Sequence, residues 1–267
     1  GLDYPSLKAQ FPGLIYCSIT GFGQDGPYAH RAGYDYIIQG MSGLMSITGP
    51  AEGEPHRVGV AVTDLFTGVY SATAILAAVI ERGRTGLGAH LDLSLMDCAV
   101  SVMANQAMNY LATGTAPGRT GNWHPNLGPY QVFEVADGHL IIATGNDGQY
   151  HRLCRILKLD ALIDDPRYRR NADRVANRAA LSEALSAATR TWHRAGLLAA
   201  CEAEGVPAGP INTMDEVFAD PQVKARGMAL DFGGHAGVRS PFVFDGERCG
   251  SPLPAPTLGE ADARQGG

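Results

Sequence analysis

The sequence predicts an α/β protein in which a smaller α+β domain is inserted into a parallel-sheet domain. Two observations lead to this fold class. Over the first 110 residues, short stretches of β-forming residues alternate with helical stretches, a rhythm that is typical of parallel sheets. The chain then changes to a Gly-, Pro- and Asn-rich loop, a hairpin and a run of charged helices. We therefore expect a large domain built from residues 1–110 and 209–267, and a small domain at residues 111–208.

The expected elements of the large domain follow one another along the first part of the chain. "SLKAQ" is typical of a helix end, "GLIYCSI" of a short strand, and "YDYIIQGMSGLMSIT" has apolar residues at helical spacing. "HRVGVAV" is expected to be a strand that leads through Asp64 into an apolar helix ending near Arg82. "GRTGLGAHLDLSLMDCAVSVMANQAMNYLATG" predicts a glycine turn, a strand and a long helix.

The small domain is expected to begin with a hairpin and continue with helices. "VFEVADGHLIIATG" contains the Asp-Gly pair that favours a tight hairpin turn. Residues 149–204 have a mostly helical, charge-rich pattern. Beyond them, "VRSPFVFD" predicts another strand of the large domain, followed by a proline-rich tail.

The composition narrows the class of protein. The chain has 267 residues, 45% of them hydrophobic, and a formal net charge of −6, which argues against nucleic acid or an anionic membrane as the main partner. The longest apolar run, residues 69–80, is shorter than a bilayer-spanning stretch. The five cysteines are far apart and show no metal-ligand spacing, so we expect a reduced intracellular protein without a metal site: Cys17, Cys98, Cys154, Cys201 and Cys249.

Several common catalytic motifs do not occur in the sequence. There is no GxSxG elbow, Walker sequence or HExxH. "GFGQDG" follows an expected strand but lacks the third glycine and the helix start of a dinucleotide-binding loop. Ser71 and Ser94 have no accompanying His and acid in the pattern, and His124 is most simply a hydrogen-bonded loop residue.

Asp64 is notable because it lies where an apolar strand is expected to meet an apolar helix. At the N-cap it would accept backbone N–H bonds, and the helix dipole would favour its anion. The same interactions keep a carboxylate available as a nucleophile or base. Glu52 and Glu54 lie in a glycine-rich loop, where glutamates are usually solvated. The local pattern leaves both roles of Asp64 open, a structural cap and a catalytic group.

A set of motifs in fixed order resembles one enzyme family across essentially the whole chain. "YCSITGFGQDGPYAHRAGYDYIIQGMSGLMSITG", "VTDLFTGVY", "GLGAHLDLSLMDCAV" and "PTLGE" are similar to class III CoA-transferases, the group of formyl-CoA transferase and carnitine CoA-transferase. "RVGVAVTDLFTGVY", "GPYQVF" and "VPAGPIN" look closest to the succinyl-CoA:dicarboxylate enzymes. The resemblance implies acyl-CoA and small carboxylic acids as substrates, with no tightly bound cofactor.

The resemblance also implies a role for particular residues. The family's nucleophilic aspartate falls on Asp64, which would form an acyl anhydride and then an aspartyl-CoA thioester in a site that excludes water. "AGYD" matches the segment that contacts CoA in the family, which places Ala32, Gly33, Tyr34 and Asp35 beside the substrate. "GNWHPNLGP" occupies the place of the family's glycine-rich loop and is a candidate lid.

Two functions other than CoA transfer are also considered, a racemase and a non-catalytic CoA-binding module. Related α-methylacyl-CoA racemases carry a histidine in "AGHD", and Tyr34 stands at that place here, a poor base at neutral pH. A truncated, non-catalytic CoA-binding module is the other alternative, because family members begin with further residues that complete a Rossmann-like domain. The family implies an interlocked homodimer. We expect a cytoplasmic location, with organellar targeting left open.

A dicarboxylate acceptor needs a cationic partner for its distal carboxylate, and the bidentate guanidinium of arginine suits that task. Candidate residues for this role are Arg57, Arg119 and Arg174.

Overall fold

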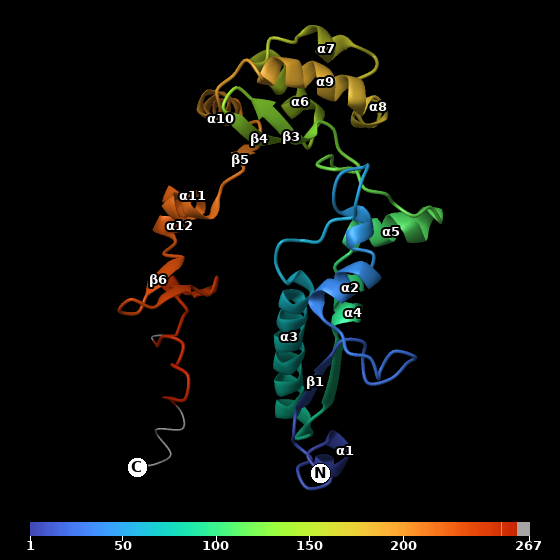
Figure 1. Cartoon of the computed structure of the whole chain (residues 1–267), viewed down its shortest axis with the longest axis vertical. Helices are drawn as coiled ribbons and strands as arrows, with labels where there is room; N and C mark the ends of the chain where they lie inside the picture. Colours follow the sequence, from blue (N-terminus) through green and yellow to red (C-terminus); the bar gives the residue numbers. More distant parts are fainter. Residues whose placement is uncertain (252, 261–267) are drawn as a thin grey trace.

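The computed structural model describes residues 1–251 and 253–260 and is a mixed α/β structure. Residues 261–267 of the predicted tail lie outside the described part. The chain forms an open arch in which a lobe at the N-terminal end and an arm at the C-terminal end are joined by a group of helices and strands at the top (Figure 1). We call these parts the N-terminal lobe (residues 1–113) and the C-terminal arm (residues 211–260).

The N-terminal lobe is built on two parallel strands and one long helix. β1 (Tyr16–Thr20) pairs in register with β2 (His90–Ser94), so both predicted strands are confirmed. The 24-residue helix α3 (Val62–Thr85) lies between them in the sequence and packs on both strands. It ends where Gly86 adopts a left-handed φ of 74°, a conformation that glycine accepts without steric cost. The other helical elements are α1 (Tyr4–Lys8), α2 (Asp35–Met41), the 3₁₀ turn η1 (Met45–Ile47), α4 (Leu95–Ser101) and α5 (Ala104–Thr113).

The strand expected just before α3 does not form. Residues 57–61 have no regular secondary structure, although "VGVAV" has the alternation typical of a strand. The backbone N–H of Val58 donates to the side chain of Gln39 rather than to a neighbouring strand. The prediction is wrong because side-chain hydrogen bonds from α2 replace the ladder that a strand needs.

Helix α3 is also longer than the sequence indicated. As a whole it is long and apolar enough to cross a membrane by length and composition, whereas the run at residues 69–80 alone is too short. Core helices of soluble proteins pass the same test, and this helix packs on β1, β2 and α4. Its other side exposes a row of apolar side chains, among them Leu65, Val69, Leu76 and Ile80.

The top of the arch is a three-stranded antiparallel sheet covered by helices. β3 (Tyr130–Val135) and β4 (Gly138–Ala143) form the predicted hairpin, and β5 (Ala208–Pro210) pairs with β4. The helices are α6 (Asp147–Ile156), α7 (Ala161–Asp164), α8 (Asn171–Ala176), α9 (Arg178–Thr189) and α10 (Arg194–Ala203). The buried residues of this part form one cluster that runs from Phe133 to Val206. The exact limits of the small domain stay a prediction.

The C-terminal arm consists of short elements. They are α11 (Met214–Ala219), α12 (Pro221–Ala225), β6 (Ala229–Asp231), β7 (Ala236–Val238), β8 (Val243–Phe244) and β9 (Glu247–Arg248). The continuous strand predicted from "VRSPFVFD" is broken in the middle. There the buried guanidinium of Arg239 donates to four backbone carbonyls, including those of Ser240 and Phe242, and the chain bends around it.

Candidate functional site

Asp64 lies in the first turn of α3 and its side chain is exposed. The N-cap of the helix is Ala61, and no side chain of the cap residue makes the capping hydrogen bond. The prediction that Asp64 is the N-cap is therefore wrong by three positions. Asp64 still lies at the N-terminal end of the helix, where the backbone N–H groups point outward. Its carboxylate is free to meet a ligand, since it makes no hydrogen bond among the described residues.

The start of α3 is capped by a different carboxylate, which comes from α2. Oδ1 of Asp35 accepts hydrogen bonds from the backbone nitrogen of Thr63 at 2.9 Å and from its Oγ1 at 2.8 Å. Oδ2 of Asp35 accepts from Nε2 of Gln39 at 2.8 Å. The carboxylate of Asp35 is thus engaged within the protein, directly beside the backbone that carries Asp64.

The "AGYD" segment lies at the start of α2. Tyr34 is the N-cap residue of α2, and 73% of its surface is exposed, so its ring is available to a ligand. Gly33 packs against Gly21, and a Cβ built on Gly33 would lie 2.5 Å from the Cα of Gly21. This contact brings the "GFG" turn against "AGYD", and it needs glycine on both sides. Contact of Ala32, Gly33 and Tyr34 with CoA stays a prediction.

The "GFGQDG" segment is a turn and not the start of a helix. The N–H of Gly23 donates to Oγ1 of Thr20, and the N–H of Gln24 donates to Oδ2 of Asp92. The next helix, α2, begins only at Asp35. The segment therefore lacks the helix N-terminus on which a dinucleotide-binding loop depends.

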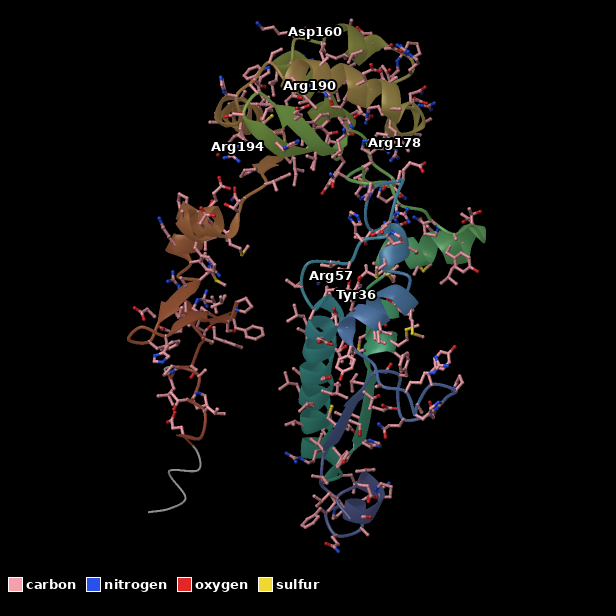
Figure 2. All side chains as sticks on the ribbon, in the orientation of Figure 1. Tyr36, Arg57, Asp160, Arg178, Arg190 and Arg194 are labelled. Atoms are coloured by element: carbon pink, nitrogen blue, oxygen red, sulfur yellow. The ribbon has the colours of Figure 1, made fainter. Side chains whose placement is uncertain are left out.

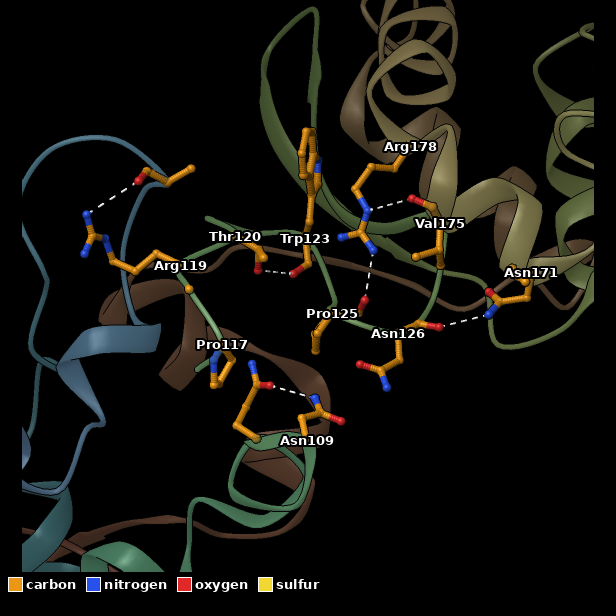
Figure 3. Close-up of a pocket in the computed structure, with 14 residues that line it drawn as sticks. Asn109, Pro117, Arg119, Thr120, Trp123, Pro125, Asn126, Asn171, Val175 and Arg178 are labelled. Carbon is orange, nitrogen blue, oxygen red and sulfur yellow. Dashed lines mark hydrogen bonds between the residues drawn. The ribbon is translucent and has the colours of Figure 1, made fainter. Parts of the chain in front are cut away.

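The predicted lid loop, residues 121–129, is hydrogen-bonded to the helices of the small domain. Arg178 donates to the carbonyl of His124. Arg178 also donates to the carbonyl of Pro125, and Nδ2 of Asn171 donates to the carbonyl of Asn126 (Figure 3). Nδ1 of His124 accepts from two backbone N–H groups within the loop, so this histidine is structural, as the sequence indicated. Movement of the loop away from α8 and α9 would break these bonds.

A cleft of about 710 Å³ lies beside this loop. Its walls come from the loop, from α5 and from α8 (Figure 3). Trp123 and Arg178 both line it, and burial lowers the pKa of the Arg178 guanidinium from its usual value. Arg178 was not among the arginines singled out from the sequence, because its contacts join segments more than 50 residues apart.

The three arginines predicted as carboxylate partners have different surroundings. The guanidinium of Arg174 is 1% exposed and pairs with Asp147 at 2.6 Å. Arg119 donates to carbonyls of the loop at residues 50–53. Arg57 is exposed, lies 5.8 Å from the ring of Tyr36, and forms no ion pair among the described residues. Figure 2 shows Arg57 and Tyr36 near the start of α3.

Ser94, Ser71 and Gly68 differ in their surroundings. Ser94 is the N-cap of α4, and its Oγ accepts from the nitrogen of Asp97. Ser71 is buried on α3. Gly68 follows Asp64 by four residues and therefore lies on the same side of the helix. A Cβ built on Gly68 meets no atom within 4 Å, so the surface beside Asp64 is open.

Comparison with known proteins gives a consistent set of relatives. Residues 1–262 match the family model of CoA-transferase family III. The chain is 53% identical to a succinate–glutarate CoA-transferase of Agrobacterium fabrum, with 99% of this chain and 67% of the relative aligned. It is 42% identical to a mouse succinyl-CoA:glutarate CoA-transferase, with 97% of this chain and 61% of the relative aligned. The chain thus spans between three fifths and about two thirds of the length of these relatives.

Solved structures agree with this assignment. A CAIB/BAIF family protein from Brucella suis superimposes with a TM-score of 0.82 at 53% identity, covering 99% of this chain and 70% of that structure. Rv3272 from Mycobacterium tuberculosis superimposes with a TM-score of 0.86 at 27% identity, covering 98% of this chain and 69% of that structure. From its motifs, its fold and these relatives, the chain belongs to CoA-transferase family III.

Proposed function

We propose that the protein transfers CoA from succinyl-CoA to a dicarboxylic acid such as glutarate, and that Asp64 is its nucleophile. One observation carries the proposal: the family's aspartate position falls on an exposed carboxylate in the first turn of α3. The two relatives described above are named for succinate and glutarate, and a further relative from Haloarcula hispanica, 40% identical, is a succinyl-CoA:mesaconate CoA-transferase. A dicarboxylate acceptor is the chemistry that these names share.

The proposed reaction exchanges acyl groups on the carboxylate of Asp64. An oxygen of Asp64 attacks the thioester carbonyl of succinyl-CoA, the C–S bond breaks, and CoA thiolate leaves behind a mixed anhydride. The thiolate then attacks the aspartyl carbonyl, which releases succinate and leaves an aspartyl-CoA thioester. The acceptor carboxylate repeats these two steps in reverse order, so the new acyl-CoA forms and Asp64 is restored. Each step keeps an activated acyl group, which explains why water must be excluded.

Substrate recognition is proposed to involve the segments that flank the start of α3. Tyr34 presents an exposed ring beside Gly33 and Ala32, in the place where CoA is expected. Arg57 begins the segment that leads into α3, and its guanidinium has no acidic partner among the described residues. It is therefore the best placed of the three predicted arginines to bind the distal carboxylate of the acceptor.

The same proposal includes a Rossmann-like large domain and an interlocked homodimer. The open arch and the separation of the C-terminal arm from the N-terminal lobe support the homodimer, since an arch leaves room for a second chain (Figure 1). The arm exposes large apolar side chains such as Phe242 and Phe244, and α3 exposes an apolar row. Exposed patches of this kind mark surfaces that are covered in an assembly. A cytoplasmic location, with organellar targeting left open, belongs to the same proposal.

A transfer assay with matched variants tests the proposal. The native protein is mixed with succinyl-CoA and glutarate, and glutaryl-CoA is followed by chromatography. Asp64→Ala is expected to abolish transfer, whereas Glu81→Ala, an exposed carboxylate on the same helix, is expected to leave it unchanged. Transfer at the native rate by Asp64→Ala would remove the nucleophile from the proposal. Binding of succinyl-CoA without any transfer by the native protein would favour a binding module.

A further inference from the structure

The backbone that carries Asp64 has no regular structure just before the helix and yet must hold the carboxylate still. Residues 57–61 form no strand, and the N-cap of α3 provides no side-chain hydrogen bond. A nucleophile displaced by about 1 Å can lose roughly 100-fold in rate. Something outside this segment must therefore fix its position.

Besides Asp35, which binds Thr63, Gln39 of α2 contacts the start of the segment at residues 57–61. Oε1 of Gln39 accepts from the backbone nitrogen of Val58 at 2.9 Å, and Nε2 of Gln39 lies 3.4 Å from the carbonyl oxygen of Val60. Asp35 binds Thr63 in the way described above. The two α2 side chains thus hold the segment at its start and at its end.

The network is partly buried, with Asp35 half-buried, and its polarity is fully determined. Gln39 is 0% exposed and Thr63 is 1% exposed. The nitrogen of Val58 can only donate, so Oε1 of Gln39 must face it. Nε2 is then left to donate to the carboxylate of Asp35. A buried network in which every partner is satisfied is costly to disturb and rigid.

We propose that Asp35 and Gln39 are positioning residues that fix the backbone of Asp64 for nucleophilic attack. This inference rests on the proposed function. It separates the role of Asp35 from that of Tyr34 in "AGYD": Tyr34 is exposed, whereas both carboxylate oxygens of Asp35 accept hydrogen bonds from other residues of the protein. Asp35 then acts on catalysis through Thr63 and not through contact with CoA.

An exchange of amide and carboxylate between the two positions tests the proposal. Asp35→Asn places two NH₂ groups face to face, and Gln39→Glu places two carboxylates face to face. The double variant, Asp35→Asn with Gln39→Glu, restores one donor and one acceptor at the contact, still provides acceptors for Thr63 and Val58, and keeps the charge of the cluster. Asp3→Asn, a carboxylate that caps α1 in the same lobe, serves as the control.

We expect each single variant to lose roughly 100-fold in kcat, with little change in the KM for succinyl-CoA. The double variant is expected to recover at least about 10-fold of that loss, since it restores the hydrogen-bond polarity. The amplitude of the enzyme–CoA adduct, measured after quenching, counts the competent molecules. A positioning role slows adduct formation while the amplitude stays at the native level, whereas a purely structural role lowers the amplitude.

Other results would overturn the inference. An unchanged kcat in both single variants, or a raised KM with an unchanged kcat, would make Asp35 a bystander or a CoA ligand. A double variant that folds but is no faster than the singles would also contradict it. If the singles do not fold, Thr63→Val and Thr63→Ser give the same answer, because only the valine removes the hydroxyl bond to Asp35. Failure of the native protein to form any adduct would instead overturn the proposed function.

Discussion

Replacement of Arg174 by methionine separates a structural role from a ligand role. Nε donates to the carbonyl of Gly128 at 2.7 Å, and Nη1 donates to the carbonyl of Tyr168 at 3.0 Å. Nη2 pairs with Asp147, whose side chain is 53% exposed, so the pair itself contributes at most about 1 kcal/mol. The guanidinium also lies 4.5 Å from the ring centre of Tyr150.

The magnitude follows from the buried carbonyls. Each buried acceptor left without a donor costs about 1–3 kcal/mol, so two of them cost about 2–6 kcal/mol, and the lost ion pair adds at most about 1 kcal/mol. In a chain of this size 1 kcal/mol corresponds to roughly 2–4 °C in Tm. We therefore expect Arg174→Met to lower the Tm by roughly 4–28 °C.

Thermal unfolding followed by circular dichroism measures this change. Arg155→Met, at an exposed arginine on α6, is the matched control and is expected to shift the free energy of unfolding by no more than about 0.5 kcal/mol. A Tm for Arg174→Met equal to that of the control, together with a raised KM for the dicarboxylate, would refute the structural role. Arg174 would then be the substrate arginine that the sequence left open.

Three further predictions concern glycines and a buried thiol. Gly68→Ala is expected to raise the free energy of unfolding by up to about 1 kcal/mol in thermal melts, because the new Cβ meets no atom and alanine favours helix. The same variant is expected to slow transfer, since the methyl group lies beside Asp64. Full activity would contradict an approach of the substrate over Gly68. Gly33→Ala is expected to cost about 1–3 kcal/mol by urea unfolding through its clash with Gly21, and unchanged stability would contradict the close approach. Burial raises the pKa of Cys201 to about 11, so its thiol stays neutral in the folded protein and is expected to resist iodoacetamide at pH 8. The contribution of the neutral thiol to the free energy of unfolding is present below pH 9 and is lost as the pH rises through about 11. Rapid labelling at pH 8 would contradict this burial.

The parts of the fold that depend on local sequence could be predicted. The β1 and β2 strands carry β-forming residues next to glycine turns, and the β3–β4 hairpin carries an Asp-Gly turn. Both are confirmed. The position of Asp64 near the start of a helix was also visible, because an acidic residue precedes a long apolar stretch.

The parts that depend on distant contacts could not be predicted. "VGVAV" has the right alternation for a strand, but Gln39, 19 residues earlier, takes the hydrogen bond of Val58. The true cap of α3 is Asp35, which lies 28 residues before Thr63. Arg174 was a candidate ligand because arginine suits carboxylates, and only the fold shows that its guanidinium is buried. Local patterns do not report which side chain reaches a given backbone group.

Asp64 is expected to become covalently linked to CoA during transfer. Mass spectrometry of the native protein, quenched after mixing with succinyl-CoA and digested with trypsin, tests it most directly. Cleavage after Arg57 and Arg82 gives the peptide of residues 58–82, in which Asp64 and Glu81 are the only carboxylate side chains. We predict a CoA adduct on this peptide that fragmentation places on Asp64 and that persists in Glu81→Ala. An adduct on Glu81, or none on this peptide in a preparation that forms glutaryl-CoA once glutarate is added, would contradict this mechanism.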